Sequence, residues 1–143
     1  MKTYAVAVDG GRTGHAVATL RAEINLGLKK GYAGFLQEKQ EVIDFLKDLY
    51  RTAVAAGRNY VPVCIQQTEI VYAYQTGDGP VADAEPALTL FSDKSPLYAA
   101  DMSDDQWKAA VEELAAALAD RFQQFRVYVS YIQVEVKILQ QVK

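Results

Sequence analysis

Apolar and polar residues alternate along residues 18–28 of this chain. The even positions are apolar, and the odd positions are polar or glycine. A spacing of two is typical of a strand with one buried and one exposed face. Other apolar runs predict four further strands, at residues 4–8, 60–75, 87–91 and 126–139.

Two other segments repeat their apolar residues at helical spacing. The first covers residues 37–56, and Gly57 follows it as a predicted C-terminal stop. The second begins at Ser103, where Gln106 completes a capping box, and its apolar stripe continues to Phe122. Each helix is therefore expected to bury a single face.

The predicted elements follow one another as strand, strand, helix, strand, strand, helix, strand. Two hairpin-like pairs separated by helices predict a two-layer α+β fold, in which both helices cover one face of a mainly antiparallel five-stranded sheet. The length predicts a single domain over residues 1–143. The strand at 60–75 is expected to lie inside the sheet, with Cys64 as a small core residue.

Composition narrows the classes of partner and the compartment. Half of the residues are apolar and the formal net charge is −3, which gives no electrostatic footprint for nucleic acid or for an anionic membrane. No stretch reaches the ~20 apolar residues that a membrane span needs. The single cysteine permits no internal disulfide. Because no apolar leader follows Met1, we expect a cytoplasmic protein.

The densest candidate chemistry lies between the first two predicted strands. Consecutive glycine N–H groups can form a concave anion site, to which an arginine and a hydroxyl would add donors. The same glycines also suit a plain hairpin connection, because they adopt positive φ at no steric cost. The candidate ligand-binding residues here are Gly10, Gly11, Arg12, Thr13, Gly14 and His15, the only histidine.

A polar island interrupts the long third predicted strand. Alternation places Gln67 and Glu69 on one face, where they either line a pocket or pair with polar residues of a neighbouring strand such as Arg21. Tyr72 and Tyr74 follow, and their rings could stack on a planar ligand such as a base. These four strand residues join the glycine-rich run as candidate binding residues.

The apolar run that ends in Asp9-Gly10-Gly11 resembles the opening hairpin of two superfamilies, the actin-like sugar kinases and ATPases and the RNase H-like nucleases. The resemblance covers about the first 30 residues. It implies that Asp9 helps to hold a divalent metal. Hard metals take several oxygen ligands, and no second carboxylate stands plainly at another strand end.

From these observations we predict a non-catalytic module that self-associates, as a dimer through its sheet, and binds a small anionic ligand such as a nucleotide or a phosphorylated metabolite. No cofactor, metal site or catalytic residue is predicted. One alternative is a metal-dependent phosphotransfer or nuclease enzyme centred on Asp9. A second is a structural or protein-interaction subunit in which the outer aromatic residues of the sheet form the interface.

Overall fold

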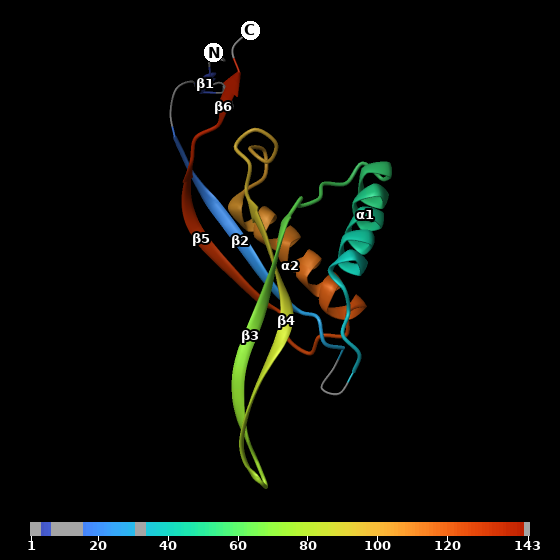
Figure 1. The fold of residues 1–143 in the computed structure, drawn as a ribbon. Coiled ribbons are helices and arrows are strands. Elements are labelled where there is room, and N and C mark those ends of the chain that lie inside the picture. The colour runs from blue at the N-terminus through green and yellow to red at the C-terminus, as the bar shows by residue number, and fades with distance from the viewer. Residues whose placement is uncertain (1–3, 7–15, 31–33, 142–143) are drawn as a thin grey trace.

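The computed structural model describes residues 4–6, 16–30 and 34–141. They form an α+β fold, as predicted from the sequence (Figure 1). The elements in chain order are β1 (Tyr4–Val6), β2 (Val17–Gly27), α1 (Lys39–Ala55), β3 (Cys64–Thr76), β4 (Gly79–Asp93), α2 (Asp104–Arg121), β5 (Tyr128–Val136) and β6 (Leu139–Gln141). Both helices lie within their predicted segments.

Four strands make one antiparallel sheet in the order β3-β4-β2-β5, and β1 pairs with β6 in a separate two-stranded ladder. The predicted five-stranded sheet is thus four strands plus this ladder, and the predicted pairing of β1 with β2 is wrong. β5 runs antiparallel to β2 and ends where β2 begins, at the pair Val17↔Val136. The chain after β5 therefore passes the start of β2 and meets the strand that precedes it.

β3 lies at an edge of the sheet, so the expectation of a central position is wrong. Within the described residues it pairs only with β4. Cys64, the first residue of β3, is exposed and is not the core residue that the sequence predicts. Farther along this strand, the apolar residues Ile70 and Val71 are exposed as well.

The two helices lie on one side of the four-stranded sheet, as predicted (Figure 1). The even-numbered residues from Ala22 to Leu26 in β2 and from Leu88 to Ser92 in β4 face the helices and are buried. The core residues include Ile24, Leu26, Leu88 and Leu90 from the sheet, Val42 and Leu46 from α1, and Val111, Leu118 and Phe122 from α2 and its cap. Burying one such side chain contributes about 1.5–3 kcal/mol, so this face dominates stability. Neither described helix is long and apolar enough to cross a membrane.

The predicted helix boundaries rest on specific backbone contacts. Ser103 Oγ accepts from the Gln106 N–H at 3.1 Å and Gln106 Oε1 accepts from the Ser103 N–H at 2.9 Å, which forms the predicted capping box. At the end of α1, Gly57 has a φ of 68°, and the Arg58 N–H donates to the Ala53 carbonyl at 2.8 Å. This Schellman closure ends α1 and turns Arg58 back beside it.

Residues 69–86, which we call the arm, form the outer half of the β3–β4 hairpin. β2 pairs with β4 only as far as Gly27↔Ala87, and beyond that pair the hairpin extends past the helices (Figure 1). The fourth predicted strand is therefore only the inner half of β4. Pro80 and Pro86 concealed the outer half in the sequence. They fit there because one edge of β4 is open in the arm and needs no N–H donor.

Candidate functional site

The glycine-rich run lies outside the described residues. Asp9, Arg12 and His15 all fall within residues 7–15, so the anion site and the metal ligand stay predictions. In the part of the chain that is described, no group of three or more histidine, cysteine, aspartate or glutamate side chains could hold a metal ion. The strand that follows the run begins at Val17, and its first residues line a cavity.

The four candidate residues of β3 are divided between the two faces of the sheet. Gln67 lies opposite the core residue Leu88, so Gln67 and Glu69 are on the helix-facing side. Both are nevertheless exposed, because β3 is at the edge. Tyr72 and Tyr74 lie on the opposite, helix-free side. The four side chains therefore do not form one site.

The suggested pairing of the polar island with Arg21 is wrong, because β4 separates β3 from β2. Arg21 instead makes a two-pronged ion pair with Asp93 of β4, in which Nε lies 2.7 Å from Oδ1 and a terminal nitrogen lies 3.1 Å from Oδ2. Its guanidinium carbon is 5.5 Å from the centre of the Phe91 ring. These contacts join β2 to β4 on the helix-free face.

The side chain of Tyr72 contacts two other residues of the arm. Its hydroxyl donates to Glu85 Oε1 at 2.7 Å, and Lys29 Nζ lies 3.7 Å from the same oxygen. The ring stacks on that of Tyr74, with centroids 6.0 Å apart. The hydrogen bond to Glu85, followed by desolvation, raises the pKa of Tyr72 to about 12. The two tyrosine rings thus contact each other, and the Tyr72 hydroxyl contacts Glu85. These contacts do not test whether the rings stack on a ligand, so that role stays a prediction.

A cavity of about 520 Å³ lies at the end of the sheet opposite the arm. Its walls come from the first residues of β2, the segment that connects β4 to α2, the start of α2 and one residue of β5. They include Val17, Thr19, Leu20, Lys94, Pro96 and Asp104. The volume falls within the range of roughly 300–1,000 Å³ that small-molecule sites occupy.

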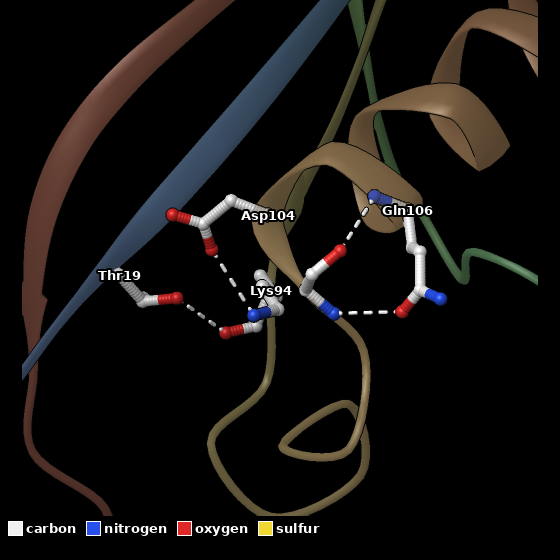
Figure 2. A network of polar contacts seen from close by, with 5 residues as sticks. Thr19, Lys94, Asp104 and Gln106 are labelled. Carbon is white, nitrogen blue, oxygen red and sulfur yellow. Dashed lines mark hydrogen bonds and ion pairs between the residues drawn. The ribbon is translucent and has the colours of Figure 1, made fainter.

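Three polar side chains meet at one wall of this cavity (Figure 2). Thr19 Oγ1 donates to the Lys94 carbonyl at 2.8 Å, and Lys94 Nζ lies 3.1 Å from Asp104 Oδ1. The Lys94 N–H also donates to the Leu20 carbonyl at 2.8 Å. The side chain of Lys94 is only 14% exposed, whereas that of Asp104 is 63% exposed. β2 therefore fixes Lys94 by its backbone, and Lys94 holds a carboxylate that a ligand can reach.

Asp104 stands at the N-terminal end of α2. It is the first residue of α2, directly after the capping residue Ser103, and the positive end of a helix stabilises negative charge. The remaining walls are largely apolar, with Val17, Leu20 and Pro96 among them. The cavity thus offers a fixed cation and an accessible carboxylate in an apolar recess, which suits a ligand with an apolar body and a charged group.

Sequence reasoning missed this cavity. Thr19 and Lys94 are 75 positions apart, and neither stands in a recognisable motif. The available signal was the capping box at Ser103, because it fixed the start of α2 and hence the place of Asp104. Nothing in the sequence indicated that the segment after β4 would close over the start of β2.

Comparison with known proteins identifies a shared fold. No protein-family model and no curated protein matches the chain. A phage SAM lyase in complex with S-methyl-5′-thioadenosine is similar, with a TM-score of 0.53 and 19% identity. A phage SAM lyase in the apo state is similar with a TM-score of 0.54 and 17% identity. Each alignment covers 92% of this chain and 92% of the other.

This likeness corrects the function expected from the sequence. The prediction of a non-catalytic binding module is wrong, because the fold that the chain shares is that of a lyase. The likeness also does not support the two alternatives, a phosphotransfer or nuclease enzyme centred on Asp9 and a purely structural subunit. The sequence misled because it shows no nucleophile at recognisable spacing and no second metal carboxylate, and we took these absences to disfavour catalysis.

Proposed function

We propose that this chain is a lyase that cleaves S-adenosylmethionine (SAM), and that it binds SAM in the cavity beside Thr19, Lys94 and Asp104. The observation that carries the proposal is the fold match over 92% of each chain to a phage SAM lyase whose complex contains S-methyl-5′-thioadenosine. A cavity of about 520 Å³ has room for a nucleoside with an amino-acid tail.

Charge supports a sulfonium substrate. SAM carries a sulfonium, an ammonium and a carboxylate, so it is a net cation, and the net charge of −3 on the chain attracts it. The anionic ligand expected from the sequence would be repelled. In the cavity, the accessible Asp104 carboxylate would bind the ammonium group, and Lys94 would hold Asp104 in position. A cytoplasmic location belongs to the same proposal.

The proposed reaction needs no co-reactant. The bond between the sulfonium sulfur and the γ-carbon of the methionine part breaks, and its electron pair goes to sulfur to give neutral S-methyl-5′-thioadenosine. A carboxylate oxygen of the substrate bonds to that carbon and closes homoserine lactone, so atoms and charge balance without water. Because opposite charges cancel as the ring closes, the apolar walls at Val17, Leu20 and Pro96 would favour this step.

Incubation of the purified chain with SAM tests the proposed activity, with the products measured by chromatography and mass spectrometry. We expect S-methyl-5′-thioadenosine and homoserine lactone in equal amounts. S-adenosylhomocysteine should remain intact, because its neutral sulfur is a poor leaving group. Formation of S-methyl-5′-thioadenosine no faster than in buffer alone would contradict the proposal.

The substitution Asp104→Asn tests the proposed site. Loss of the carboxylate should lower kcat/KM by about tenfold or more, because a charge-assisted contact to the substrate is removed. Asp105→Asn is the matched control, since Asp105 lies in the same helical turn but does not line the cavity. Circular dichroism would establish that both variants are folded. Equal activity of the two variants would place the reaction elsewhere on the molecule.

We also propose that the chain self-associates, in the simplest form as a dimer, through the helix-free face of the sheet. Large apolar side chains are exposed on this face, which favours association. They are Ile70, Tyr74, Tyr128 and Ile132. Light scattering after size-exclusion chromatography should show a dimer at micromolar concentration, and Tyr128→Asp should shift it toward monomer. A monomeric parent chain would contradict this proposal.

A further inference from the structure

A second cavity, which we call the interhelical groove, lies between α1 and α2. It measures about 320 Å³ and shares no wall residue with the cavity beside Lys94. Its walls come from the C-terminal half of α1, the middle of α2 and the segment that leaves α1 at residues 58–61. Three features of these walls identify the kind of ligand that the groove would bind.

One wall is aromatic and held in place. The Tyr50 hydroxyl donates to the Val61 carbonyl at 2.6 Å, and the Tyr50 and Tyr60 rings lie 4.8 Å apart at an angle of 35°. Burial raises the pKa of Tyr50, so its hydroxyl keeps this hydrogen bond throughout the ordinary pH range. Tyr60 lines the groove and is 45% exposed, so its ring offers a surface on which a planar ligand can stack.

The floor of the groove is apolar and built largely from small side chains. Ala53 and Leu114 are buried there, and Ala110 and Ala117 of α2 are half-buried. Small residues at these positions leave a recess deep enough for a flat ring. A volume of about 320 Å³ is close to the lower limit for small-molecule sites and is too small for a helix about 10 Å wide.

Two opposite charges stand at the groove. Arg58 is placed there by the Schellman closure of α1, and Glu113 projects from α2. Both residues are exposed, and among the ion pairs of the described residues none involves either side chain. Arg58 is therefore available to a carboxylate and Glu113 to an ammonium group.

We propose that the interhelical groove binds a small aromatic zwitterion, the chemical class of the aromatic α-amino acids. The ring would lie on the floor against Tyr60, with the carboxylate toward Arg58 and the ammonium toward Glu113. A fully apolar ligand would leave both charges unused, and a simple anion would meet Glu113. The proposal is independent of the proposed lyase activity, because the two cavities share no wall residue.

Titration of the ¹⁵N-labelled full chain with L-tryptophan, followed through backbone amide shifts, tests this proposal. We expect saturable shifts at residues 58–61 and 110–117, and none at residues 17–20 of the other cavity. Indole, which has the ring but neither charge, should bind at least about tenfold more weakly. Equal affinity for indole and L-tryptophan, or no saturable shift at the groove, would overturn the proposal.

Matched substitutions test the assignment of each ligand group. Arg58→Gln and Glu113→Gln should each weaken binding of L-tryptophan by about tenfold, and Tyr60→Leu should weaken it more than Tyr60→Phe, which keeps the ring. The controls Arg51→Gln and Glu112→Gln remove similar charges outside the groove and should leave binding unchanged. If the folded Arg58→Gln and Glu113→Gln variants bind as the parent does, the zwitterion assignment is wrong.

Discussion

The inner and outer halves of the β3–β4 hairpin share one backbone ladder but differ in their surroundings. In the inner half, Leu88 and Leu90 face the helices and are completely buried. In the arm, Val71 lies on the same side of the sheet as Leu88 and yet is 77% exposed. Ladder hydrogen bonds position both halves equally, whereas apolar burial occurs only where a helix covers the strands.

The two halves also differ in the kind of chemistry they can support. Polar contacts in the arm are mostly local, as in the hydrogen bond from Tyr72 to Glu85 across one hairpin. At the opposite end of the sheet, Thr19 meets Lys94, which lies 75 positions later in the chain, and together with Asp104 they border a cavity. The arm therefore suits contact with another molecule, and the helix-covered body suits enclosure of a small ligand.

The largest expected effect is a difference in the free energy of unfolding between two variants, each with one apolar side chain shortened on the same face of the hairpin. Leu88→Ala should lower the free energy of unfolding by about 2–5 kcal/mol, because it leaves a void in a closed core. Val71→Ala should change it by no more than about 0.5 kcal/mol, because that side chain is already in solvent. Urea unfolding of both variants measures the difference, and similar losses would show that the arm is covered in solution.

A smaller effect compares hydroxyl contacts in the body and at the tip of the arm. Ser103→Ala removes the cap of α2 and should lower the free energy of unfolding by about 1 kcal/mol, while Ser103→Asp should retain most of it. Thr76→Ala removes the hydrogen bond from Thr76 to the Gly79 carbonyl at the hairpin turn. We expect it to cost less than about 0.5 kcal/mol in the same urea measurement.

Excision of the outer arm tests whether the body folds without it. Replacing residues 71–84 with Asn-Gly would join Ile70 to Glu85 through a two-residue turn. These two residues face each other across the ladder in the same alternation as Thr76 and Gly79 at the natural turn. The shortened chain should unfold cooperatively, with a free energy within about 1 kcal/mol of the parent. Thermal and urea unfolding measure this. A non-cooperative transition would mean that the arm is part of the folding unit.

The smallest effect concerns alkaline pH. The raised pKa of Tyr72, about 12, means that the folded state binds its proton more tightly than the unfolded state. Its contribution to stability is therefore complete below pH 10 and is lost as the pH rises through 12. Urea unfolding between pH 8 and 12 should show a weaker pH dependence for Tyr72→Phe than for the parent. An identical dependence would show that the hydrogen bond to Glu85 is absent in solution.

The predicted elements that held are those fixed by local contacts. Strict alternation marked β2, and helical spacing with the capping box at Ser103 and the stop at Gly57 marked both helices. The outer half of β4 escaped detection, because Pro80 and Pro86 normally argue against a strand and are allowed here only by an open edge. The candidate site was missed for a similar reason, since Thr19 and Lys94 meet only after the chain has folded.

The sequence by itself determined the α+β class, the two amphipathic helices and the apolar face of β2, because each depends on contacts within about one turn or one strand. Only the tertiary structure decided that β3 is an edge strand, that β1 pairs with β6 and that Lys94 and Asp104 border a cavity. Those features depend on which strand lies beside which. Strand order follows from how the helices cover the whole sheet and from where the hairpin extends beyond them.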